Sequence, residues 1–121
     1  MLLESRWSRP LARRGDSGYI LATVRYDIVL APGAIDGLRA LRAHERADVR
    51  DALEKHLRHE PTKLSRSRVK RLRGMRRPQY RLRVGEIRVF YDVFEATVEV
   101  LAIISKEQAI AWLAREGEGD S

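Results

Sequence analysis

Three arginines of this chain stand where their side chains can act on one ligand. Arg81 and Arg83 alternate with apolar residues, and Arg88 follows on the far side of a Gly85-Glu86 step. A guanidinium donates two parallel hydrogen bonds to a phosphate, and it stabilises negative charge that grows during phosphoryl chemistry. Because it keeps its proton, it is a poor general base. The trio therefore predicts a site that binds phosphate groups and stabilises charge on them.

Further basic residues surround this trio. The segment from Thr62 to Tyr91 holds eleven lysines and arginines and one acid, Glu86, which gives it a net charge of +10. Since the whole chain carries +7, the remainder sums to 7 minus 10, or −3. Such concentrated charge favours polyanions, because each neutralised phosphate releases counterions. The alternative is a solubilising basic surface, although such surfaces usually mix both signs. We predict that the following residues bind nucleic-acid phosphates: Lys70, Arg71, Arg73, Arg76 and Arg77.

Length and composition fit one small domain. The chain has 121 residues, of which 44% are hydrophobic and 34% charged, enough for one modest core. It has no cysteine, so nothing indicates an oxidising compartment, and we expect a cytoplasmic protein without a membrane role. Residues 1–24 show neither helical nor strand period and predict a disordered extension. The domain is expected at 25–115, with a flexible tail at 116–121.

Hydrophobic periodicity predicts a strand and two helices before the basic segment. Tyr26, Ile28 and Leu30 alternate with other residues up to Ala31-Pro32-Gly33, which is typical of a short strand. Apolar residues at helical spacing then predict a short and a longer helix that end before Pro61. The residues concerned are Ile35, Leu38 and Leu41 in the first helix, and Val49, Ala52, Leu53 and Leu57 in the second.

The segment from Gln79 to Phe94 predicts a β-hairpin. Gly85 can adopt the positive φ that a type II′ two-residue turn requires. With Gly85 and Glu86 as the loop, alternate residues sort onto two faces of the sheet. The apolar face comprises Tyr80, Leu82, Val84, Ile87, Val89, Tyr91 and Val93. The opposite face comprises Arg81, Arg83, Arg88 and Phe90, with Arg83 directly opposite Arg88. Such a like-charge pair is unfavourable unless an anion binds there.

A buried strand and a helix complete the expected chain order. A short strand is possible at Val69–Leu72, residues 98–105 read as a strand buried on both sides, and residues 108–115 read as a helix. The predicted fold class is α+β, with an antiparallel sheet of about four strands packed on an N-terminal helical hairpin and a short C-terminal helix.

Other residue types offer weaker candidates for chemistry. His44, His56 and His59 belong to the helices, away from the arginine face, and Tyr91 falls on the core face, where packing is its expected role. Glu86 and Glu107 are minor candidates for a base. The sequence carries no metal-ligand spacing, Walker loop or dinucleotide fingerprint, so no metal and no small-molecule cofactor are predicted.

The hairpin and its flanks resemble the RelE/ParE toxins of type II toxin–antitoxin systems. The resemblance covers roughly residues 25–113 and is carried by Arg71–Gly74, Tyr80–Asp92 and Val98–Leu101. It implies a metal-independent, ribosome-dependent mRNA endoribonuclease that inhibits translation, with Arg81, Arg83 and Arg88 as catalytic residues around the scissile phosphate. It also implies an acidic, partly disordered antitoxin of the RelB-like or Phd-like kind.

Two alternatives remain open at the level of sequence. One is a ParE-like gyrase inhibitor, which shares the fold and cuts no RNA. The other is a catalytically degenerate module that binds nucleic acid or an antitoxin. The segment Ser105–Leu113 keeps both open, because it lacks the arginine and tyrosine that well-studied RelE-like toxins have there, and Trp112 offers at most a stacking surface.

Overall fold

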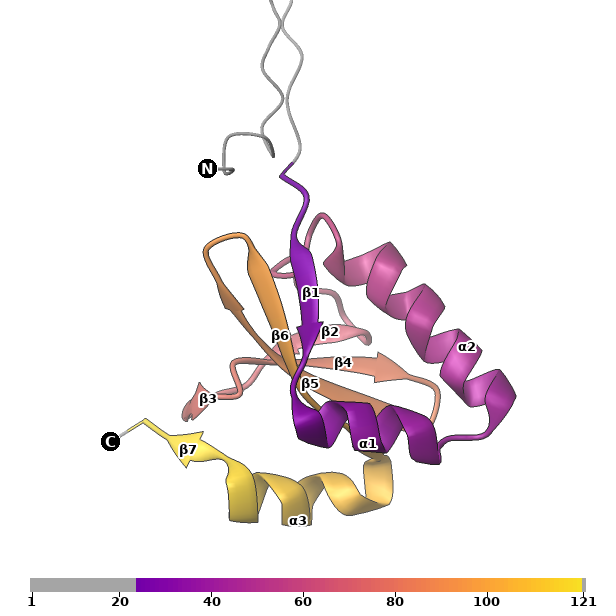
Figure 1. Cartoon of the computed structure of the whole chain (residues 1–121). Helices are drawn as coiled ribbons and strands as arrows, with labels where there is room; N and C mark the ends of the chain where they lie inside the picture. The colour runs from indigo at the N-terminus through magenta and orange to yellow at the C-terminus, as the bar shows by residue number, and fades with distance from the viewer. Residues whose placement is uncertain (1–23, 121) are drawn as a thin grey trace, which may run out of the picture.

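A mixed sheet organises the chain in this computed structural model, which describes residues 24–120 (Figure 1). The sheet has five strands in the order β1-β6-β5-β4-β2, and β3 and β7 form a separate pair. The elements are β1 (Asp27–Leu30), α1 (Pro32–Ala40), α2 (Ala43–Ala52), the π-helical turn η2 (Leu53–Leu57), β2 (Val69–Arg71), β3 (Met75–Arg77), β4 (Tyr80–Val84), β5 (Ile87–Phe94), β6 (Thr97–Ser105), α3 (Lys106–Glu116) and β7 (Glu118–Gly119). The predicted extension at residues 1–24 lies outside the described residues except for Val24.

Helices α1 and α2 cover one face of the sheet, as the sequence predicts. Pro32 occupies the first turn of α1, where its missing N–H costs nothing. The backbone N–H of Arg42 donates to the Glu45 carboxylate at 3.2 Å and so caps the start of α2. Val49, Leu53 and Leu57 are spaced by four residues and are all buried against the strands.

The β4–β5 hairpin has the predicted register. Val84 pairs with Ile87, and the pairing continues residue by residue to Tyr80 opposite Tyr91. Gly85 has a φ of +59°, as the predicted turn requires. The apolar face of the hairpin joins Val98, Val100 and Ile103 in the core under the helices.

The opposite face of the sheet is only partly covered, by α3. Helix α3 reaches that face through Trp112, whose indole stacks on Phe90 with ring centroids 5.2 Å apart. Phe90 is buried as a result. Beyond α3, strand β7 pairs with β3, and the backbone N–H of Asp120 donates to the Gly74 carbonyl. Residues 116–121, which are expected to form a flexible tail, include Glu118 and Gly119 of this paired strand.

The predicted fold class is confirmed, with one addition to the sheet. Strands β6, β5, β4 and β2 form an antiparallel set, and β1 adds a fifth strand that runs parallel to β6. Parallel neighbours need a long connection, and this one contains the whole of residues 31–96. Between residues 24 and 120, no helix is long and apolar enough to cross a bilayer.

Candidate phosphate-binding site

Cross-strand pairing places the three predicted catalytic arginines together on the face that α1 and α2 leave open. Two rows of partners cross the sheet there. The first row is Lys70, Arg81, Phe90 and Ala102, and the second is Arg83, Arg88 and Ile104. Directly opposite residues in antiparallel strands have Cβ atoms roughly 5 Å apart. Strands β2, β4 and β5 therefore build one compact cationic patch, which we call the arginine cluster: Lys70, Arg81, Arg83 and Arg88.

Arg81 lies at the centre of the arginine cluster, where burial and neighbouring positive charges both act against its charged form. Its side chain is partly buried, and its Nε atom is buried without a hydrogen-bond partner among the described residues. Burial lowers the pKa of the Arg81 guanidinium, and the positive charges of Arg88 and Arg83 lower it further. A phosphate bound at the cluster would offset this repulsion with negative charge.

Among the described residues, the hydrogen bonds of Arg83 and Arg88 go to backbone carbonyl groups. One Nη atom of Arg88 donates to the carbonyl oxygens of Gly85, at 2.9 Å, and Ile87, at 3.1 Å. Arg83 reaches the carbonyl of Ser67 at 3.5 Å. Within residues 24–120, no carboxylate forms an ion pair with Arg81, Arg83 or Arg88. Glu86 is close in sequence, but it pairs with Lys106 at 3.1 Å.

The five residues predicted to bind phosphates lie in different surroundings. Lys70 belongs to the arginine cluster, and Arg73 is exposed on the β2–β3 connection. Arg71 lies on the other side of β2, where its guanidinium sits 5.4 Å from the ring centroid of Tyr80 and donates to the Gln79 carbonyl at 2.9 Å. Arg71 is thus tied to the protein's own backbone.

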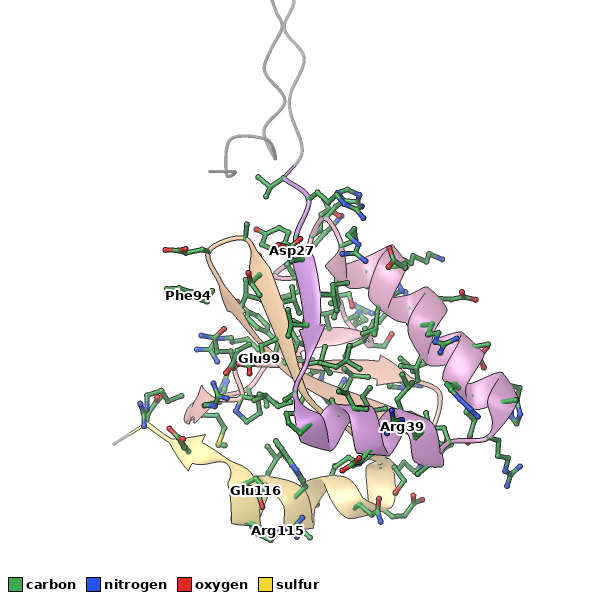
Figure 2. All side chains as sticks on the ribbon, viewed as in Figure 1. Asp27, Arg39, Phe94, Glu99, Arg115 and Glu116 are labelled. Atoms are coloured by element: carbon green, nitrogen blue, oxygen red, sulfur yellow. The ribbon has the colours of Figure 1, made fainter. Side chains whose placement is uncertain are left out.

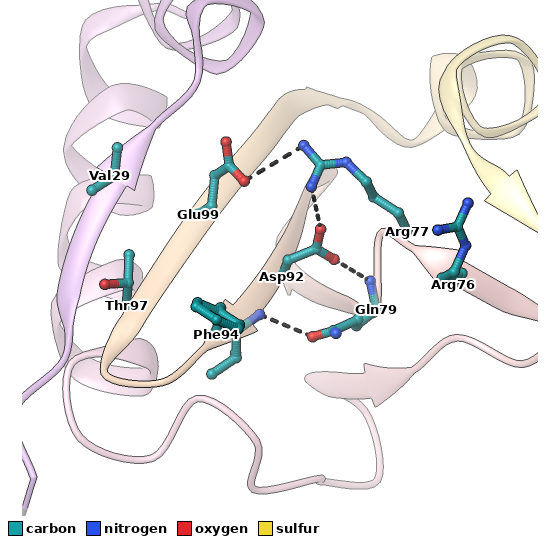
Figure 3. Close-up of a pocket in the computed structure, with 9 residues that line it drawn as sticks. Val29, Arg76, Arg77, Gln79, Asp92, Phe94, Thr97 and Glu99 are labelled. Atoms are coloured by element: carbon teal, nitrogen blue, oxygen red, sulfur yellow. Dashed lines mark hydrogen bonds and ion pairs between the residues drawn. The ribbon is translucent and has the colours of Figure 1, made fainter.

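Arg76 and Arg77 already have acidic partners. Arg76 pairs with Glu118 of β7 at 2.6 Å. Arg77 bridges Asp92 at 3.0 Å and Glu99 at 3.5 Å, as Figure 3 shows. These two arginines are therefore less available to an external phosphate than the arginine cluster is.

Asp92 fixes Arg77 at the wall of an open groove. It accepts the backbone N–H of Gln79 at 2.7 Å, and burial raises its pKa although Gln79 and Arg77 act in the opposite direction. The groove has a volume of about 540 Å³ and includes the exposed side chains of Val29 and Phe94. Phe94 is 72% exposed and projects away from the helical hairpin (Figure 2).

The remaining candidates are placed where packing explains them. Tyr91 is fully buried and donates a hydrogen bond from its hydroxyl to the Pro61 carbonyl at 2.6 Å, so its predicted packing role is confirmed. Burial raises the Tyr91 pKa above its ordinary value. His44 and His56 lie on α2 and η2, and His59 follows them; burial lowers the pKa of His56. None of these groups belongs to the arginine cluster.

Periodicity did not predict the neighbourhood that α3 adds to this face. Ile104, the cross-strand partner of Arg88, lines a cavity with Trp112 and other α3 residues. Ile104 and Trp112 are far from Arg81 in the sequence. The β5–β6 register brings Ile104 to the arginine face, and the stacking on Phe90 brings Trp112 there. The aromatic residue Trp112 was the one sequence feature that pointed to this neighbourhood. Its position in the sequence does not reveal that the ring covers Phe90.

The fold and this face define a small α+β protein with clustered cations on an open sheet surface. The fold is that of chains in solved RelB–RelE complexes. A chain of the RelBE2 toxin–antitoxin complex of Mycobacterium tuberculosis matches with a TM-score of 0.56 and 24% identity, over 68% of this chain and 99% of that one. A chain of the RelB–RelE complex of Methanococcus jannaschii matches with a TM-score of 0.55 and 18% identity, over 69% and 96%. A chain of the RelE–RelB complex of Pyrococcus horikoshii matches with a TM-score of 0.53 and 24% identity, over 69% and 97%. No family model and no curated protein sequence matches.

Proposed function

We propose that the chain is the toxin of a type II toxin–antitoxin pair and cleaves mRNA in a ribosome-dependent, metal-independent reaction that inhibits translation in the cytoplasm. One observation carries the proposal. On a RelE-like fold, register places Arg81, Arg83 and Arg88 side by side without carboxylate partners among the described residues, and the buried Nε of Arg81 has no acceptor.

The proposed chemistry is attack of a ribose 2′-hydroxyl on its own phosphodiester. Negative charge grows on the phosphate oxygens as the new P–O bond forms and the bond to the 5′-oxygen breaks. The products are a 2′,3′-cyclic phosphate and a 5′-hydroxyl, whose oxygen takes up one proton as it leaves. Arg81, Arg83 and Arg88 stabilise that charge from fixed positions on two paired strands, which requires little rearrangement during the reaction. Since arginine is a poor proton acceptor, the hydroxyl proton leaves to a group outside this trio. A substrate held by the ribosome would supply the geometry that the small chain alone lacks.

The proposed partner in the resting cell is an antitoxin. The solved neighbours come from complexes that are described as toxin–antitoxin or RelB–RelE complexes. An acidic, partly disordered partner would complement the arginine cluster and would gain order on binding. Its removal would free the arginines for RNA.

Induced expression in a bacterial host tests this function. Cells expressing the wild type, a triple variant of the cluster and a charge-matched control are compared for growth and for mRNA 5′ ends within translated frames. The triple variant is Arg81→Ala, Arg83→Ala and Arg88→Ala. The control removes three exposed cations from the helical hairpin: Arg39→Ala, Arg50→Ala and Lys55→Ala.

Each outcome assigns a function. We expect growth arrest with new in-frame cuts from the wild type and the control, and loss of both from the triple variant, because losing one charge-stabilising donor typically lowers a rate about a hundredfold. Arrest with intact mRNA would contradict the nuclease and favour a target such as gyrase. If growth continues although the protein is folded, the result would favour a binding module that cuts no RNA.

A further inference from the structure

A second feature of the arginine face is a cavity of about 440 Å³ beside α3. It is lined by Ile104, Glu107, Gln108, Ala111, Trp112 and Arg115. Ile104 pairs directly with Arg88 across β5 and β6, so this cavity adjoins the arginine cluster. Its volume falls within the range typical of small-molecule sites. It belongs to neither the cluster nor the groove at Phe94.

The cavity contains a rigid aromatic platform. The Trp112 ring lies nearly parallel to Phe90, with an angle of 6° between the planes, and Phe90 is the cross-strand partner of Arg81. Because Phe90 is buried and fixed in β5, the indole is held in a defined orientation. Indole surface that lines a cavity next to guanidinium groups offers stacking to a base whose phosphate those groups hold.

The polar groups of the cavity provide a donor and acceptor pattern. Glu107 and Gln108 belong to the first turn of α3, Arg115 lies two turns further on, and all three line the cavity. An ionised carboxylate only accepts hydrogen bonds, whereas the Gln108 amide both donates and accepts. Such a pair suits a base edge that carries an amino group, as cytosine does at its 4-position. Uracil has a carbonyl there, which a carboxylate repels.

We propose that this cavity binds a nucleobase next to the phosphate held by the arginine cluster, with Trp112 as the stacking surface and Glu107 as the residue that favours bases with an exocyclic amino group. The inference rests on the proposed function in one respect, since it takes the phosphate of the arginine cluster to belong to a nucleotide. It assigns base preference to α3 and phosphate binding to the sheet.

Fluorescence of Trp112 tests the proposal directly. The chain has two tryptophans, Trp7 and Trp112, so Trp7→Phe in the full-length protein leaves Trp112 as the sole reporter. This protein is titrated with cytidine 5′-monophosphate, uridine 5′-monophosphate and ribose 5-phosphate. We expect both nucleotides to quench the indole and ribose 5-phosphate to leave it unchanged, because only a base can stack. Cytidine monophosphate should bind about fivefold more tightly than uridine monophosphate, since only cytosine donates to a carboxylate.

Two variants distinguish recognition of the base by Glu107 from a general effect of negative charge. Glu107→Ala should abolish the preference for cytidine monophosphate. Glu95→Gly removes the same charge outside the cavity, at a hairpin position whose φ of 54° suits glycine, and should keep the preference. Equal effects of ribose 5-phosphate and the nucleotides, no preference between the two nucleotides, or a preference that survives Glu107→Ala would each overturn the proposal.

The result is independent of the cleavage experiment. If the nucleotides quench Trp112 with the expected preference but the protein cuts no mRNA in cells, the base site is supported and the nuclease function is contradicted. If the protein cleaves mRNA in a way that depends on the arginines but neither nucleotide changes Trp112 fluorescence, the nuclease function is supported and the base site is contradicted.

Discussion

At the scale of single residues, the arginine cluster is costly to the folded protein. Arg81 is partly buried, its Nε lacks an acceptor among the described residues, and Arg83 and Arg88 repel it. A buried donor without a partner and a group of like charges both destabilise a fold. Sites of this kind commonly trade stability for function.

This trade-off predicts a stabilising substitution. Arg81→Met keeps an unbranched apolar stem and removes the charge, so the free energy of unfolding should rise by about 0.5–1 kcal/mol while RNA binding falls. Chemical denaturation at low salt measures the change. Arg83→Met, at an exposed position, is the control and should change stability by less than about 0.5 kcal/mol. A large loss of stability in Arg81→Met would mean that the guanidinium stabilises the fold.

Tyr91 makes the opposite contribution, because its hydroxyl stabilises the core. Tyr91→Phe leaves the buried Pro61 carbonyl without its donor and should lower the free energy of unfolding by about 1–2 kcal/mol. The Tyr91 pKa is raised in the folded state. Above the ordinary value of 10.0, the unfolded chain loses this proton first, so the advantage of the wild type over Tyr91→Phe should shrink as the pH rises. Denaturation curves between pH 7 and about 11 check both points, and a pH-independent difference would contradict the second.

At the scale of elements, α1 lies unusually close to β6 at one glycine. A Cβ at Gly37 would stand 2.2 Å from the Ile103 carbonyl oxygen, whereas one at Gly33 would meet its nearest atom, the Leu101 oxygen, at 3.5 Å. The first distance is far below van der Waals contact and involves backbone, which cannot move without disturbing the strand.

The two glycines therefore form a matched pair for substitution. Gly37→Ala should destabilise the protein by about 1–3 kcal/mol, because the helix must move away from the sheet. Gly33→Ala should be neutral or stabilising by up to about 1 kcal/mol, since alanine favours helix. Thermal unfolding of both variants measures the difference. Equal melting temperatures would show that α1 packs less closely against β6 than described.

At the scale of the whole molecule, the hydrophobic core and the candidate phosphate-binding site lie on opposite faces of the sheet. One face carries the helices and the core, while the other carries the arginine cluster, α3 and the open groove at Phe94. Binding of a polyanion to the second face should then depend strongly on salt and little on the helical hairpin.

This separation predicts a measurable salt dependence. For single-stranded RNA, the logarithm of the binding constant should fall with the logarithm of salt concentration by about 0.7 for each phosphate neutralised. Removing Arg81, Arg83 and Arg88 should make that slope shallower by about 2. Fluorescence anisotropy of a labelled oligonucleotide measures it. The hairpin control lacking Arg39, Arg50 and Lys55 should keep the wild-type slope, and an equal reduction there would show that charge acts without regard to position.

The sequence by itself determined the local parts of this protein. Alternation of polar and apolar residues is fixed by the pleat of a strand, so the β4–β5 register and the shared face of Arg81, Arg83 and Arg88 followed from spacing and from Gly85. Helical spacing likewise placed Val49, Leu53 and Leu57 in the core. The order of these periodic elements predicted the α+β fold class, which the structure confirms.

Tertiary structure alone decided what lies beside those residues. Arg71, Arg76 and Arg77 look like the cluster arginines in sequence, yet contacts with Gln79, Glu118, Asp92 and Glu99 hold them. The parallel pairing of β1 with β6, the β3–β7 pair and the contact of Trp112 with Phe90 join residues far apart in the chain. No local period encodes such pairings, because they depend on how several elements pack at once.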